Sequence, residues 1–306
     1  MLTFRFAALR PSYLSHFASV LGAAAIFAGQ SHAGVIIDYP NFSSTAGLTL
    51  VGSTTTTSSQ LELTPAAIGQ SGAAYSTTAV PLGAGDTFST TFQFQITDTG
   101  GIDPADGITF VLAASPSGLG TGGGDIGYGG VGNSVAIEFD TYDNGSDDGD
   151  SSNHVAIDED GSIDDGTSGG DQDLVNAYGV SSCGFPSSYL ASGCMANGDI
   201  WSVTIGYDGT NLAVSVWDMS GTHAEAAPFT IYTAQPVNIS SFLGTTNAYV
   251  GFTGGTGSGF EQQDILNWEL ANTSTLPPPS TTPEPATMTL VFAGIAGIVL
   301  AKRRRS

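Results

Sequence analysis

The sequence predicts an all-β protein, an antiparallel β-sandwich in a single domain, from three observations. Apolar and polar residues alternate in several short runs, as they do on strands with one buried face. Turn residues separate these runs, and the chain contains 42 Gly. Apolar residues make up 41% of the chain, including 16 Phe, 10 Tyr and 3 Trp, which is enough to fill a sizeable core.

The clearest strands are short segments in which every second residue is apolar. They are Leu61–Leu63, Thr91–Ile96, Val203–Ile205 and Leu212–Trp217. The dipeptide Asp208-Gly209 stands between the last two segments and favours a tight hairpin turn. Helical periodicity and internal repeats are both missing from the body of the chain. We therefore expect sheets rather than a mixed fold.

The N-terminus has the pattern of a secretory signal peptide. Arg5 and Arg10 precede an apolar stretch at residues 17–29, and the tripeptide Ser31-His32-Ala33 has small residues at its first and last positions. This order predicts a signal peptide over residues 1–33, cleaved after Ala33. A buried N-terminal helix is the alternative interpretation.

The C-terminus begins with a Pro- and Thr-rich linker at residues 273–282, followed by residues 283–306. The latter hold Pro283-Glu284-Pro285, a short apolar transmembrane segment below the roughly 20 residues that span a bilayer comfortably, and a cluster of Lys and Arg. This order resembles the PEP-CTERM sorting signal of Gram-negative bacteria. The resemblance implies cleavage by an exosortase and delivery to the cell surface or extracellular matrix; a permanent anchor is the alternative.

All six Lys and Arg residues lie in the two end segments, whereas 27 of the 28 acidic residues lie in residues 34–282. Without cationic side chains, this region has no means of neutralising phosphates, which excludes a nucleic-acid partner. Its carboxylates must be solvated, hydrogen-bonded or bound to cations. Cys183 and Cys194 stand in a Gly-, Ser- and Pro-rich segment, and their spacing predicts a local disulfide formed in an oxidising compartment.

The densest group of polar residues lies in residues 135–158. On a strand, Glu138 and Asp140 point to the same side, away from the apolar residues between and before them. Two carboxylates about 4 Å apart repel by about 4 kcal/mol at a surface-like dielectric. In a region without Lys or Arg, we expect a divalent cation to offset this repulsion.

Further ligands follow the two carboxylates, namely Asn144, Asp147, Asp148, Asp150 and His154. Oxygen ligands suit Ca²⁺, whereas carboxylates combined with a histidine suit Mn²⁺ or another transition metal. On spacing alone, a solvated acidic loop with a surface histidine is an equal alternative.

This stretch resembles the metal-binding segment of legume-type (L-type) lectins, whose pattern is Glu-x-Asp-x-aromatic-x-Asn, then Asp, then His-x-x-Ile-Asp. The matching residues are Glu138, Asp140, Tyr142, Asn144, His154, Ile157 and Asp158. The resemblance implies that Asp140 and a downstream aspartate, Asp148 or else Asp150, bridge two metals. It also implies that Glu138 and His154 complete the transition-metal site. The Tyr142 carbonyl and the Asn144 side chain would complete the Ca²⁺ site.

Four further segments resemble the same family in the same order. They are an early strand pair at residues 61–82, an aspartate segment at 105–110, a glycine-rich loop at 122–127, and a last strand pair at 249–270 with a specificity loop at about 254–259. The resemblance implies a concanavalin-like jelly roll over residues 34–272.

The resemblance also implies a carbohydrate site formed by Asp106, Gly124, Tyr142 and Asn144. Asp106 would follow a cis peptide bond and accept hydrogen bonds from two sugar hydroxyls. Gly124 would let its backbone N–H approach the sugar, because no Cβ intervenes. The Tyr142 ring would pack on the pyranose, and the Asn144 amide would donate to a hydroxyl. A turn aspartate, a flexible glycine run and a core aromatic are the structural alternatives.

The acidic segment at residues 159–173 departs from the family pattern. We interpret it as solvated surface, with an additional Ca²⁺ loop as the alternative. Together these features predict a secreted, metal-dependent, carbohydrate-binding lectin that is not an enzyme and binds a glycan or exopolysaccharide. A glycosidase on the same sandwich is the first alternative, although Tyr142 and Asp143 stand where its second Glu would be required. A structural matrix protein that binds no sugar is the second alternative.

Overall fold

The computed structural model describes residues 34–148, 150–163, 172–174, 182–220 and 224–275. The chain divides after Ala33 into two units, and the described residues all belong to the second. The predicted signal peptide, the sorting signal and residues 164–171 of the acidic segment lie outside the described residues. Within the described ranges, no helix is long and apolar enough to cross a membrane.

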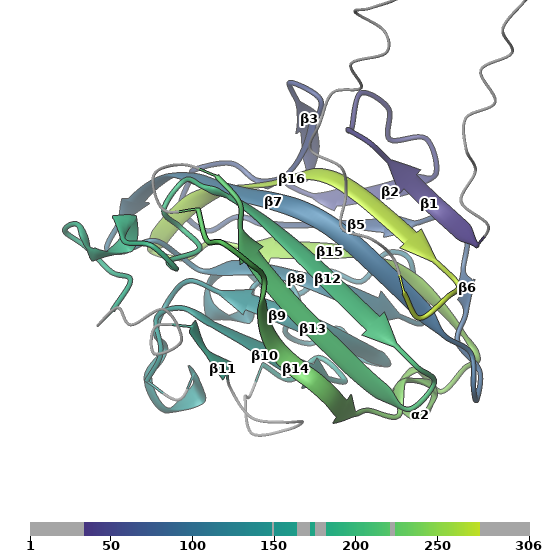
Figure 1. Cartoon of the computed structure of the whole chain (residues 1–306). Coiled ribbons are helices and arrows are strands. Elements are labelled where there is room, and N and C mark those ends of the chain that lie inside the picture. Colours follow the sequence, from purple (N-terminus) through teal and green to yellow (C-terminus); the bar gives the residue numbers. More distant parts are fainter. Residues whose placement is uncertain (1–33, 149, 164–171, 175–181, 221–223, 276–306) are drawn as a thin grey trace, which may run out of the picture. The chain divides into compact units, whose positions relative to one another are not determined.

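Two antiparallel sheets pack face to face (Figure 1). The first, called the β7 sheet, has the order β14-β13-β12-β7-β16-β4-β3, with β1 beside β16. Its strands are β1 (Val35–Tyr39), β3 (Thr55–Thr57), β4 (Gln60–Thr64), β7 (Phe88–Gly101), β12 (Ile200–Tyr207), β13 (Asn211–Asp218), β14 (Phe229–Pro236) and β16 (Gly259–Ala271).

The second, called the β9 sheet, has the order β11-β10-β9-β8-β15-β5-β2, with β6 beside β15. Its strands are β2 (Leu48–Gly52), β5 (Ser71–Ser76), β6 (Val80–Pro81), β8 (Gly107–Ala113), β9 (Ser134–Asp140), β10 (His154–Glu159), β11 (Gln172–Asp173) and β15 (Asn247–Gly255). Short helical turns occur at η1 (Gly123–Asp125), η2 (Gly145–Asp148), η3 (Ser188–Leu190) and α2 (Ile239–Leu243). The predicted all-β sandwich is therefore confirmed.

The predicted alternating strands lie within β4, β7, β12 and β13, and the predicted hairpin joins β12 to β13. The Asp208 carboxylate stabilises its turn by accepting the N–H groups of Thr210 at 2.9 Å and Asn211 at 2.7 Å. This short-range hydrogen bonding is the reason that aspartate favours such turns.

The two segments expected to form strand pairs do not pair internally. β4 and β5 lie in opposite sheets, and so do β15 and β16. Each strand instead pairs with partners distant in sequence, such as β16 with β7 and β15 with β8. The turn at residues 256–258 thus connects the two sheets, at one end of the sandwich.

The core between the sheets is rich in aromatic rings. The Phe92 ring from the β7 sheet meets Phe110, Phe139 and Phe252 from the β9 sheet, at centroid distances of 6.0, 5.9 and 4.9 Å. Trp268 on β16 packs edge-on against Phe252 at 5.0 Å. These buried rings supply much of the apolar area that stabilises the sandwich.

β8 and β9 are buried on both faces, unlike strands with one solvent-facing side. The alternation predicted for β9 is present, because Ile137 and Phe139 enter the main core while Ala136 points the other way. However, Tyr128 and Val131 from the preceding loop cover that second side in a smaller apolar cluster. Glu138 and Asp140 are also fully removed from solvent.

Candidate functional site

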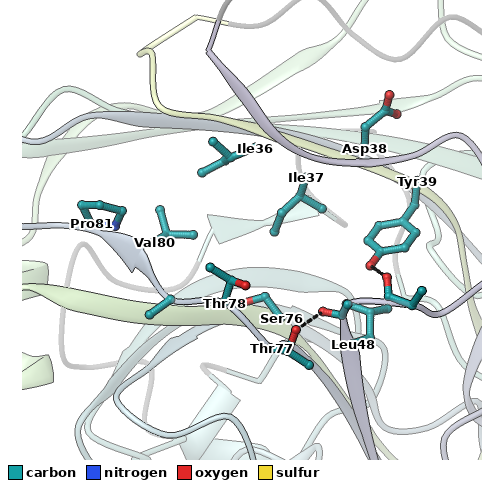
Figure 2. A pocket seen from close by; sticks show the side chains of 13 residues that line it. Ile36, Ile37, Asp38, Tyr39, Leu48, Ser76, Thr77, Thr78, Val80 and Pro81 are labelled. Carbon is teal, nitrogen blue, oxygen red and sulfur yellow. Dashed lines mark hydrogen bonds between the residues drawn. The ribbon is translucent and has the colours of Figure 1, made fainter. Parts of the chain in front are cut away.

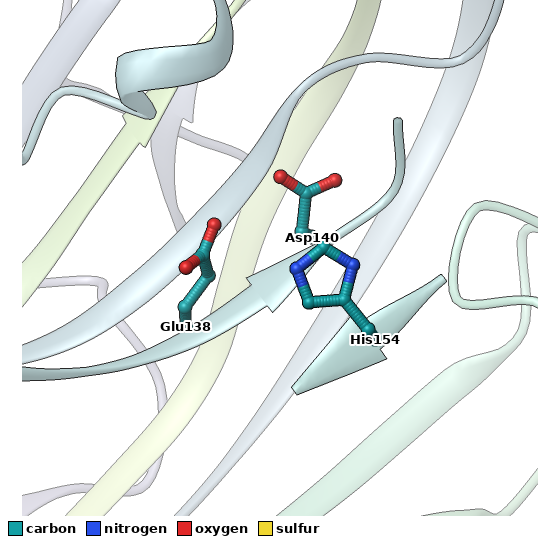
Figure 3. A group of neighbouring side chains, drawn as sticks. All are labelled: Glu138, Asp140 and His154. Atoms are coloured by element: carbon teal, nitrogen blue, oxygen red, sulfur yellow. The ribbon is translucent and has the colours of Figure 1, made fainter. Parts of the chain in front are cut away.

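The Glu138, Asp140 and His154 side chains converge at one end of β9 and β10 (Figure 3). One potential ligand atom from each lies within 4.8 Å of the other two, and all three residues are fully buried. The antiparallel ladder brings them together, because Asp140 on β9 is directly opposite His154 on β10. The three residues match the donor set that transition metals prefer.

Burial raises the pKa of Asp140 well above its usual range, and the neighbouring Glu138 and Asp148 carboxylates raise it further. Asp140 Oδ1 accepts the Tyr142 N–H at 2.6 Å, whereas Oδ2 has no hydrogen-bond donor among the described residues. His154 Nδ1 lies 3.3 Å from the Ser151 carbonyl. When Nδ1 carries the proton and donates it to this carbonyl, the lone pair of Nε2 is suited to bind a metal. The residues present therefore fit a bound cation.

Asp148, in the loop between β9 and β10, adds a further carboxylate to this acidic group. It ends the turn η2, is 2% exposed, and accepts a hydrogen bond from the Asn144 N–H. Its charge adds to the rise in the pKa of both Asp140 and Asp106, so its carboxylate lies near both groups. Asp150, the alternative bridging residue, is exposed and has a left-handed φ of 61°.

Asp106 directly precedes β8, at the edge of the site. The Ala105–Asp106 peptide bond is cis, as the resemblance implied. The Asp106 N–H donates to Gly255 at 3.0 Å, and its carbonyl accepts from Thr141 at 2.9 Å. Burial raises the pKa of the Asp106 carboxyl to about 7, although a hydrogen bond from the Gly257 backbone lowers it in part. Its Oδ2 atom has no hydrogen-bond donor among the described residues.

Gly124 and Asn144 are in direct contact. A Cβ at Gly124 would lie 2.8 to 2.9 Å from the atoms of the Asn144 amide, too close for any side chain without movement. A pocket of about 280 Å³ opens here, and its lining residues are Gly122, Gly124, Asp125, Asn144, Asp148 and Ile163. Asp106 does not line this pocket. It adjoins it through Gly257, where a Cβ would lie 3.3 Å from Asp106 Oδ2 and 3.2 Å from Gly123.

Tyr142 is half-buried between these groups. Partial burial raises the pKa of its phenol, and the Asp103 and Asp106 carboxylates raise it further. The structure therefore brings the predicted metal and sugar residues to one end of the β9 sheet. Asp125, Ile163 and Asp103 also reach this end, and the sequence pattern did not single them out as site residues.

Glu261 on β16 is a further buried acid behind the site. Its Oε1 accepts hydrogen bonds from Thr141 Oγ1 at 2.9 Å and Gln263 Nε2 at 3.2 Å. Burial raises its pKa to about 8, with a contribution from Asp106. The sequence separation of 120 between Thr141 and Glu261 explains why no local sequence signal identified this contact.

Cys183 and Cys194 form the predicted disulfide, with their Cα atoms 5.5 Å apart. The side chain of Asn153, next to His154, holds one end of this loop by bonding to the residues on either side of Cys194. Its Nδ2 donates to the Gly193 carbonyl at 2.8 Å, and its Oδ1 accepts the Met195 N–H at 2.8 Å. The disulfide loop is thus attached directly to the strand that carries the histidine.

Another pocket, of about 380 Å³, lies between β1 and the residues that follow β5 (Figure 2). Its wall is largely apolar, with Asp38 as its one acidic residue. Tyr39 Oη closes one side by donating to the Ala46 carbonyl at 2.7 Å. None of the sequence-predicted site residues lines this pocket.

The C-terminal segment matches the PEP-CTERM protein-sorting motif over residues 281–305. Among individual proteins, the chain is 41% identical to the galactose-binding lectin of Arachis hypogaea over 78 residues, which are 23% of this chain and 28% of that lectin. It is 30% identical over 193 residues to LECRPA3 of Robinia pseudoacacia, a bark agglutinin by its name, covering 61% of this chain and 59% of the relative. The matches therefore span less than two thirds of either relative.

Solved structures give a match over the whole sandwich. The lectin from Bauhinia forficata, solved in complex with GalNAc, superimposes with a TM-score of 0.60 and 25% identity, covering 79% of this chain and 100% of that structure. The legume lectin domain profile matches residues 36–286. The chain belongs to the legume lectin family and ends in a PEP-CTERM sorting motif.

Proposed function

We propose that the protein is a secreted, metal-dependent lectin that binds a glycan or exopolysaccharide at the cell surface or in the extracellular matrix. The observation that carries this proposal is the convergence of Glu138, Asp140 and His154 beside a pocket bordered by Gly124 and Asn144. The sorting motif supports the location, with an exosortase as the processing partner.

Two cations would occupy the acidic end of the site. We assign Mn²⁺ or another transition metal to Glu138, Asp140 and His154, because this donor set combines carboxylates with an imidazole. We assign Ca²⁺ to the oxygen ligands of Asp140, Asp148, Asn144 and the Tyr142 carbonyl. The burial of Asp148 supports it over Asp150 as the bridging residue.

The sugar would bind between Asp106, Gly124, Tyr142 and Asn144. Asp106 Oδ2, which has no donor among the described residues, would accept a hydrogen bond from a sugar hydroxyl, and a cation beside it would favour its charged form at neutral pH. The names of the relatives make galactose and GalNAc the first sugars to test. The role proposed is binding rather than hydrolysis, since Tyr142 and Asp143 occupy the positions required for a second catalytic Glu.

A glycan array of the purified protein, with and without EDTA, tests the proposal. We expect binding that EDTA abolishes and that Ca²⁺ with Mn²⁺ restores. Asp106→Ala should abolish binding, whereas the matched variant Asp38→Ala, at an exposed position on β1, should retain it. Binding that survives in Asp106→Ala would place the sugar elsewhere, and an array without any bound glycan would favour the structural matrix protein.

A further inference from the structure

The disulfide loop (residues 183–194) is held against the segment that leads to Asp106. The Phe185 N–H donates to Asp103 Oδ1 at 2.5 Å. Gly184 lies so close to the same carboxylate that a Cβ there would be 2.9 Å from Oδ1. Three residues of extended chain span at most about 10 Å, so Asp103 holds the loop at the border of the proposed sugar site.

The opposite side of the disulfide loop is fixed to the metal-binding segment. The Cys183 N–H donates to Ser152 Oγ at 3.0 Å, and Asn153 bonds to residues on either side of Cys194. The loop therefore bridges the segment of Asp106 and the segment of His154. Its disulfide and these hydrogen bonds give it a defined position before any ligand arrives.

The loop presents an aromatic pair at this border. The rings of Phe185 and Tyr189 pack edge-to-face with centroids 5.2 Å apart, and both residues are half-buried. Two exposed apolar residues are sequence neighbours of this border, Leu190 after Tyr189 at 47% exposure and Ile102 before Asp103 at 59%. Exposed apolar groups gathered around a polar site mark a binding surface, and an aromatic face can pack on the apolar face of a sugar ring.

The charge of this border restricts what can bind. Asp103 and Asp106 both lie near the Tyr142 phenol, and residues 34–282 contain no Lys or Arg to offset them. Negatively charged sugars such as uronates would be repelled by Asp103, which is not among the proposed metal ligands. We propose that the disulfide loop forms a second subsite, in which Phe185 and Tyr189 hold the next unit of a neutral oligosaccharide whose first unit binds at Asp106. This inference rests on the proposed function.

Titration calorimetry with saccharides of increasing length tests the subsite. The probes are mono-, di- and trisaccharides of galactose, glucose and mannose, together with trigalacturonate. In the wild-type protein, we expect the di- or trisaccharide of the bound sugar to bind more tightly than its monosaccharide. Phe185→Ala and Tyr189→Ala should each weaken this longer ligand about 3- to 10-fold and leave the monosaccharide unchanged.

The controls separate this inference from the proposed function. Phe185→Tyr keeps an aromatic ring and should retain the gain from chain length, as should Phe229→Ala on β14. Unchanged monosaccharide binding also shows that the variants are folded. A missing gain from chain length in the wild-type protein, an equal loss for monosaccharide and trisaccharide, or trigalacturonate bound as tightly as the neutral trisaccharide would each overturn the subsite. Only the absence of monosaccharide and oligosaccharide binding together would overturn the proposed function as well.

Discussion

Asp140 and His154 face each other across the β9–β10 ladder, where β9 ends and β10 begins. Glu138 lies two residues earlier on β9, on the same side of the strand, and the three side chains meet in a fully buried space. A carboxylate pair in such a place is unfavourable unless a cation or a proton offsets its charge. The stability of this end of the sandwich should therefore depend on metal.

We expect chelation to lower the melting temperature, and Ca²⁺ with Mn²⁺ to restore it, because a ligand that binds only the folded state stabilises it. Glu138→Gln should have two opposite effects. It should raise the melting temperature of the chelated protein, since it removes a buried charge beside Asp140, and it should reduce the gain on adding metal. Calorimetry with and without EDTA measures both, and an unchanged melting temperature after complete demetallation would rule out the metal assignment.

Gly124→Ala should weaken glycan binding by at least about tenfold, because its Cβ would displace the Asn144 amide. Gly132→Ala is the matched control. Gly132 is exposed, and a Cβ there would meet only Asp160 Oδ1, at an ordinary 3.6 Å. Titration of both variants with the ligand identified on the array gives the comparison. Equal affinities would show that Gly124 does not border the sugar.

The stability of the chelated protein should fall as the pH rises from about 4.5 to about 8. Glu261 has its pKa raised from 4.5 to about 8, so the unfolded chain loses this proton at a lower pH than the folded protein. Asp106, with a pKa of about 7, acts in the same direction. Glu261→Gln removes one buried charge and should stabilise the protein at pH 8.5 by on the order of 2–4 kcal/mol, with little change at pH 4.

Urea unfolding at several pH values measures this effect in wild-type and variant proteins. Asp38→Asn, at an exposed position, is the control and should leave the pH dependence unchanged. Parallel pH curves for wild-type and Glu261→Gln proteins would show that Glu261 does not cause the pH dependence.

Replacing both cysteines with serine should reduce the free energy of unfolding by about 2–3 kcal/mol, because the disulfide closes a loop with a sequence separation of 11. A reducing agent should destabilise the wild-type protein by a similar amount and have no effect on the double variant. A double variant as stable as the oxidised wild-type protein would contradict this prediction.

Much of the β-sandwich could be predicted from local patterns. The alternating runs in β4, β7, β12 and β13 and the Asp208 turn depend on neighbouring residues only, and the structure contains all of them. The pairing of strands was less accessible. β15 and β16 follow each other in sequence as the strands of a hairpin do, yet they lie in opposite sheets. Each strand faces the shared core with its apolar side, one from each layer of the sandwich.

The sequence by itself determined the C-terminal sorting motif, the family resemblance, the cysteine pair and the identity of the metal-binding candidates. Each of these depends on residue types at short, fixed spacings. Tertiary structure alone decided that Glu138 and Asp140 are buried, that Glu261 lies behind Asp106, and that the disulfide loop contacts Asp103. Such contacts join residues 80 to 160 positions apart in the sequence. They form only when the sheets pack and the loops cover them, and local alternation of residue types does not encode these long-range contacts.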